Sequence, residues 1–130
     1  MTEANIEGSP PIETTAKSIF DKPADGISPE LVAFLKLAER EGVYSRLTEQ
    51  RRHIIEQYVI GGLSERQIAG DLKKSRQAVS QSLRLSPASM HRDMVQDVLD
   101  GKTQVSYTEI KTAYDALGKP LILRRRNKIG

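Results

Sequence analysis

From residue 27 onward, apolar residues recur with the period of an α-helix. Leu31, Phe34, Leu35 and Ala38 follow the i, i+3, i+4, i+7 spacing that places side chains on one face of a helix. Further stretches of this kind follow, separated by short polar linkers. The pattern predicts an all-α protein, a helical bundle of about six helices.

Serine or threonine precedes five of the expected helices, in the position of an N-cap. Ser28 and Ser86 are each followed by a proline, which fits the first position of a helix. A glutamine or glutamate stands three residues after Ser64 and Ser106, which is the pattern of a capping box. A sixth helix is expected from about residue 76. The predicted caps are Ser28, Thr48, Ser64, Ser86 and Ser106.

The composition divides the chain into three parts. Residues 1–26 are rich in proline, glycine, serine, threonine and glutamate, which predicts a disordered or loosely attached acidic leader. Residues 27–120 form the expected helical domain, and residues 121–130 form a short basic tail. There is no cysteine, and no apolar run approaches the ~18 residues that a membrane span needs. We therefore expect a cytoplasmic protein that is associated with the nucleoid and does not enter a membrane.

The distribution of charge points to a nucleic-acid partner. The net charge is only +3, but residues 1–42 carry 4 basic and 8 acidic side chains, whereas residues 43–130 carry 16 and 9. A basic body of this kind is typical of proteins that bind a polyanion. Between Asp71 and Asp93 there is no acidic residue at all. This acid-free run contains Lys73, Lys74, Arg76, Arg84 and Arg92.

Residues 64–85 have the spacing of a helix-turn-helix. A capped helix over residues 64–72 precedes a three-residue turn and a second helix that begins at about residue 76. The small Ala69 would let the two helices pack closely. Apolar residues fall where the helices would bury their shared seam, namely Ile68, Leu72, Val79 and Leu83.

The polar residues of this segment predict two kinds of DNA contact. The second helix would present residue types that suit base edges, since arginine matches guanine, glutamine matches adenine and serine matches either. These candidate base-reading residues are Arg76, Gln77, Ser80, Gln81 and Arg84. The helix starts and the turn would hold phosphates. The candidate phosphate-binding residues are Ser64, Arg66, Lys73, Lys74 and Ser75.

The segments "LSERQIAGDLKKSRQAVSQSLRLSP" and "MVQDVLDGKTQVSYTEIKTAYDAL" resemble the DNA-binding helical domain of the ParB/KorB family of plasmid and chromosome partition proteins. The resemblance covers under half of the chain. It implies binding to an operator or a centromere-like site. Because the helices after the helix-turn-helix also touch DNA in that family, it further implies Tyr107, Thr108 and Lys111 as secondary candidates, although an ordinary helix surface explains these three equally well.

The chain departs from the family at several points. Lys73 stands where the turn usually prefers glycine, and Ser82 stands where the seam is usually apolar. Nothing resembles the family's nucleotide-binding box with its Gly-Glu-Arg-Arg motif, and we expect no separate C-terminal dimerisation domain. The resemblance therefore implies site binding without a CTP-driven clamp.

Other functions fit the sequence less well. Residues 47–72 also resemble the helix-turn-helix units of sigma factors and response regulators, which again implies a DNA-binding regulator. The two histidines, His53 and His91, lack partners at a metal-ligand spacing, and there is no glycine-rich phosphate loop. We therefore expect no enzyme, cofactor or metal site. A partition-type or polymerase-binding adaptor remains the alternative, with residues 1–42 contacting a protein partner.

These observations predict a sequence-specific binder of double-stranded DNA. The expected role is that of a transcriptional repressor of plasmid, phage or mobile-element type, which occupies an operator through a recognition helix in the major groove. Because one such module gives limited affinity, we expect a homodimer on a palindromic site.

Overall fold

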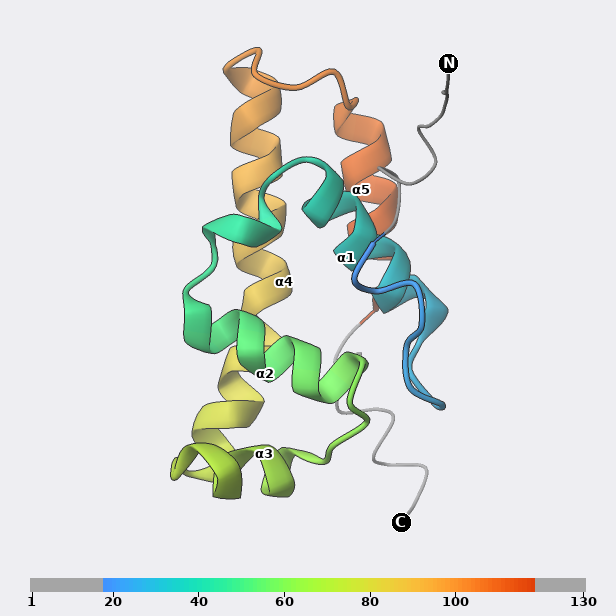
Figure 1. Cartoon of the computed structure of the whole chain (residues 1–130). Helices are drawn as coiled ribbons and strands as arrows, with labels where there is room; N and C mark the ends of the chain where they lie inside the picture. Colours follow the sequence, from blue (N-terminus) through green and yellow to red (C-terminus); the bar gives the residue numbers. More distant parts are fainter. Residues whose placement is uncertain (1–17, 119–130) are drawn as a thin grey trace, which may run out of the picture.

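A computed structural model describes residues 18–118 of the protein and shows helices without any β-strand in this part of the chain. The predicted all-α bundle is confirmed, with five α-helices and one short 3₁₀ turn (Figure 1). The elements are α1 (Pro29–Arg40), η1 (Tyr44–Arg46), α2 (Glu49–Val59), α3 (Glu65–Leu72), α4 (Arg76–Leu99) and α5 (Tyr107–Asp115).

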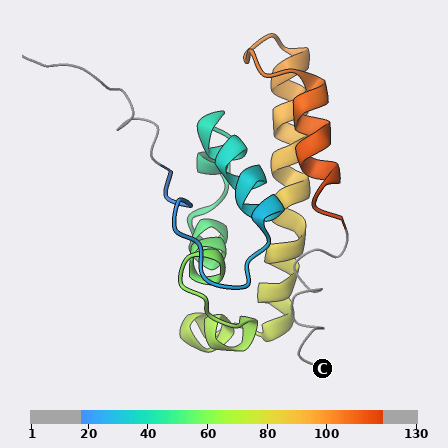
Figure 2. The same ribbon diagram turned by 90° about the vertical axis from the view of Figure 1, so that its right-hand side faces the viewer.

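The long helix α4 forms the spine of the bundle. It contacts each of the other four α-helices. Helices α2 and α3 pack at its first half, while α5 runs beside its second half (Figures 1 and 2). Four apolar side chains on α4 are at most 2% exposed and form the centre of the core, Val79, Leu83, Met90 and Met94. No helix in residues 18–118 is long and apolar enough to cross a membrane.

Four of the five predicted capping residues stand at the start of a helix. The side chains of Ser28, Thr48, Ser64 and Ser106 each accept a hydrogen bond from the backbone N–H three residues later. Only Ser64 has the complete capping box, because the Gln67 side chain also accepts a hydrogen bond from the Ser64 N–H. The predicted box at Ser106 is half formed, since the Glu109 carboxylate pairs with Arg40 instead.

The prediction of about six helices is wrong by one, and the error lies at Ser86 and Pro87. Residue 86 does not start a helix. The helix α4 runs through it for 24 residues, with Pro87 inside. The Ser86 hydroxyl donates a hydrogen bond to the Ser82 carbonyl, 2.6 Å away, rather than capping a new helix. Pro87 is buried, so packing along the length of α4 outweighs the hydrogen bond that the proline removes.

The predicted boundary of the leader at residue 26 also differs from the structure, because residues 18–26 pack onto the bundle. Phe20 is fully buried, and its ring meets that of Tyr44 edge-on with 5.2 Å between centroids. The Ala24 N–H donates to the Val59 carbonyl at 2.7 Å. Residues 1–17 and the predicted tail at 121–130 lie outside the described residues. Within the described residues, the packed part of the chain therefore includes residues 18–26.

We expect Phe20→Ala to lower the free energy of unfolding by about 3 kcal/mol, because it removes a fully buried aromatic ring. The neighbouring Ile19 is 46% exposed, so Ile19→Ala should change stability by no more than about 0.5 kcal/mol. Urea denaturation of both variants measures the difference. A loss for Phe20→Ala as small as that expected for Ile19→Ala would show that the Phe20 ring contributes nothing to the core.

Candidate nucleic-acid interface

The acid-free run over residues 72–92 covers the end of α3, the turn after it and most of α4. The turn occupies residues 73–75 and is tight. Its first residue, Lys73, has φ 57° and is the one non-glycine residue with positive φ in residues 18–118. The next N–H, that of Lys74, donates back to the Ala69 carbonyl at 2.9 Å. Lys73 thus occupies the left-handed position that favours glycine.

The predicted seam between α3 and α4 is confirmed. Ile68, Val79 and Leu83 are each at most 2% exposed, and Ala69 is buried beside them in the same core cluster. Leu72 is partly buried and packs against this cluster. Because these residues face inward, the other side of α4 faces solvent along its first turns.

Most of the predicted base-reading residues lie on that solvent side. Gln77, Gln81 and Arg84 are exposed and follow the i, i+4, i+7 spacing of one helix face. They span about 10 Å along the axis at 1.5 Å per residue. None of the three side chains has a hydrogen bond or an ion pair within the described chain. Arg76 is exposed at the start of the same helix, and Ser80 is half-buried at the edge of the face.

The predicted phosphate-binding residues fall into two groups at the two ends of α3. Ser64 and Arg66 stand at the start of α3, and Lys73, Lys74 and Ser75 stand at the start of α4. The hydroxyl oxygens of Ser64 and Ser75 accept backbone N–H groups as helix caps, at 3.1 and 3.0 Å. A hydroxyl that accepts in this way still has its hydrogen to donate to a phosphate oxygen. The three basic residues are exposed.

The secondary candidates are separated from these two groups. Tyr107, Thr108 and Lys111 are exposed on α5, which lies beside the second half of α4 and away from α3 (Figures 1 and 2). The Lys111 ammonium donates a hydrogen bond to Asp115 at 2.6 Å, and this contact raises the pKa of Lys111. The structure does not bring the α5 residues together with the α3–α4 surface.

One residue of this surface was missed by the sequence analysis. Glu65 is the first residue of α3, and its side chain is only 2% exposed. Its Oε1 lies 3.9 Å from Nε of Arg76, so folding brings an acid next to the acid-free run. An acidic residue in the first turn of a helix is ordinarily explained by the helix dipole. Only the three-dimensional contact distinguishes Glu65 from such a residue.

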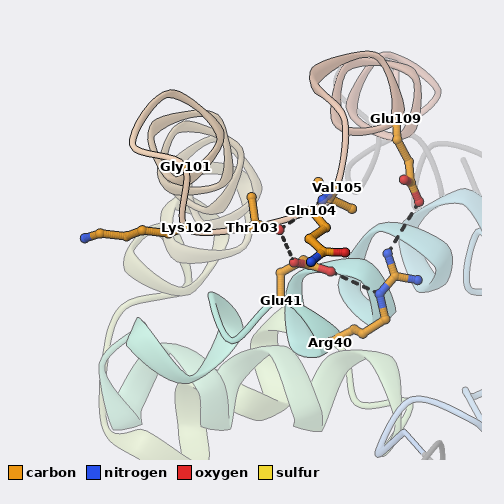
Figure 3. Close-up of a pocket in the computed structure, with 8 residues that line it drawn as sticks. All are labelled: Arg40, Glu41, Gly101, Lys102, Thr103, Gln104, Val105 and Glu109. Carbon is orange, nitrogen blue, oxygen red and sulfur yellow. Dashed lines mark hydrogen bonds and ion pairs between the residues drawn. The ribbon is translucent and has the colours of Figure 1, made fainter.

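The open pocket between α1 and the α4–α5 loop offers no comparable surface. Three of its charged groups pair with one another, since Arg40 contacts both Glu41 and Glu109, and Thr103 donates to Glu41 (Figure 3). The contact with Glu41 is the main cause that raises the pKa of Arg40. Lys102 points away from the other residues drawn (Figure 3). The residues from 18 to 118 contain no cluster of His, Asp or Glu that could hold a metal ion.

Comparisons with protein-family models, with curated proteins and with solved structures found no match to this chain.

Replacing Lys73 by glycine should raise the free energy of unfolding by about 1 kcal/mol, because glycine adopts the left-handed conformation without the steric cost that lysine has there. Lys74→Gly is the matched control. Lys74 has no positive φ, so glycine there should give no gain. Chemical denaturation compares the two variants with the parent. A Lys73→Gly protein less stable than the parent would contradict the conformation of this turn.

Proposed function

We propose that this protein binds double-stranded DNA in a sequence-specific manner, with the first turns of α4 in the major groove. One observation carries the proposal. The acid-free run folds into an exposed face of arginine and glutamine on a capped helix, and Gln77, Gln81 and Arg84 have no partner within the described chain. A solvated helix face normally includes acidic residues that pair with its cations, and this face has none in its sequence.

The chemistry of the face supports recognition of bases. Arg76 and Arg84 suit guanine, Gln77 and Gln81 suit adenine, and each good bidentate pair discriminates by about 1–3 kcal/mol. Ser64, Arg66 and the three turn residues Lys73, Lys74 and Ser75 would set the register on phosphates at the starts of α3 and α4. Tyr107, Thr108 and Lys111 lie apart from this surface, so they are not included in the proposed contact.

The proposed role is that of a repressor that excludes RNA polymerase by occupying an operator. A dimer on an inverted repeat would raise the affinity of so small a recognition surface. The ParB/KorB-like segments support a plasmid, phage or mobile-element origin and a place on the nucleoid. The acidic N-terminal leader, predicted over residues 1–26, would contact a protein partner. In the alternative role, that of an adaptor, the helical body would contact proteins rather than bases.

Selection from a random duplex pool at about 150 mM salt, where binding to phosphates alone is weak, tests the proposal. We expect an inverted repeat. Gln81→Ala should then weaken binding to the selected site about tenfold and relax the preference at one base pair. Gln96→Ala is the matched control, an exposed glutamine at the far end of α4. If the selection recovers only non-specific complexes that dissociate as salt is raised, sequence-specific binding is refuted and the adaptor role is favoured.

The phosphate contacts have a separate test. Lys74→Ala should weaken binding to all sequences alike and reduce the slope of log K against log salt by about one. Lys102→Ala removes the same charge from an exposed lysine of the α4–α5 loop and should leave the slope unchanged. Fluorescence anisotropy at several salt concentrations measures both variants. If Lys74→Ala keeps the slope of the parent, Lys74 is excluded from the interface.

A further inference from the structure

Glu65 is an acid that the fold conceals beside the proposed DNA-binding face. Its side chain is 2% exposed, and its Oε2 is buried without a hydrogen bond from any described residue. Its Oε1 lies 3.9 Å from Nε of Arg76, the first residue of α4. The cation is 60% exposed, so the pair joins a buried carboxylate to an arginine that reaches into solvent.

The stability of the fold does not account for this carboxylate. A buried carboxylate loses its hydration, and an oxygen without a donor does not recover that loss. The dipole at the start of α3 favours a negative charge, but it offsets only part of the cost of burial. The Arg76 guanidinium is accessible to water and needs no partner to be solvated. A residue that is unfavourable to the fold yet aimed at a proposed base-reading side chain points to a role in binding.

The geometry shows what that role would be. The Glu65 carboxylate lies nearest to Nε of the guanidinium, and no hydrogen bond or ion pair joins Nη1 or Nη2 to another described residue. The Nη1 and Nη2 edge forms the end-on fork that matches O6 and N7 of guanine. At 3.9 Å from Nε the carboxylate makes no hydrogen bond, but its charge attracts the guanidinium and favours the rotamers that keep it near, so less freedom is lost on binding. Its negative charge also disfavours an approach of Arg76 to a DNA phosphate.

We propose that Glu65 is a positioning residue, which holds Arg76 for one guanine in the major groove and keeps it from binding phosphates without regard to sequence. This inference rests on the proposed function of α4. It adds a determinant of specificity that itself touches no DNA.

The test uses Glu65→Gln and Glu65→Met in the full chain, on the site recovered by selection and on an unrelated duplex. Both variants should lose about tenfold in the ratio of specific to non-specific affinity. Binding to the unrelated duplex should stay unchanged or tighten, because Arg76 is released toward phosphates. The lost specificity should concern the same base pair at which Arg76→Ala relaxes the preference. The double variant Glu65→Gln/Arg76→Ala should show no lower affinity ratio than Arg76→Ala alone. Unfolding should show that Glu65→Met is at least as stable as the parent.

Glu49→Gln is the matched control, because Glu49 is also the first residue of its helix but is exposed on α2. It should leave the affinity ratio unchanged. One outcome separates the two proposals: the parent and Arg76→Ala differ in base preference, and both Glu65 variants keep the base preference of the parent. The positioning role is then overturned and the proposed function stands. If the parent itself shows no preference, the proposed function fails and the inference with it. Unfolding of both Glu65 variants would overturn the inference by making Glu65 a structural residue.

Discussion

Burial of one side of α4 is the interaction on which the rest of the structure depends. Val79, Leu83, Met90 and Met94 lie along this side, and every other α-helix contacts α4. Each of these helices is too short to be stable alone, so they persist because they cover this apolar surface together. The opposite side of the first turns of α4 must then face solvent. The proposed DNA-binding face is thus a direct consequence of how the core is packed.

The paired and unpaired charges of the folded protein are distributed unequally between the two ends of α4. Beside the second half of α4, acids and bases pair within the protein. There the Arg46 guanidinium donates to both oxygens of Asp97, which is buried, and this contact raises the pKa of Arg46. Around the turn between α3 and α4, Glu65 is the one acid paired with a cation in the described residues. The positive charge of that end therefore remains available to an external anion, which supports the proposed partner.

The sequence predicted the local features of the fold because they depend on neighbouring residues. A serine or threonine before an amphipathic stretch places a helix start, and the period of the apolar residues selects the buried face. Both predictions hold at Ser64 and along the α3–α4 seam. The features it missed depend on distant contacts. Phe20 stands in a segment whose composition predicts disorder, yet the bundle buries its side chain. Ser86 and Pro87 have the pattern of a helix start, yet they lie inside the continuous helix α4.

For the candidate site, the sequence by itself determined the residue types of the face and their spacing, because side chains three and four residues apart on a helix share a side whatever the helix packs against. The resemblance to the ParB/KorB family also marked Lys73 as standing where the turn usually prefers glycine, and the structure gives this residue a left-handed conformation. Only the tertiary structure decided that Tyr107 and Lys111 stand apart from that face. It also decided that Glu65 meets Arg76 across the turn, at 3.9 Å. The reason is physical: the distance between residues on different helices depends on how those helices pack, and the order of residues along a single chain does not contain that information.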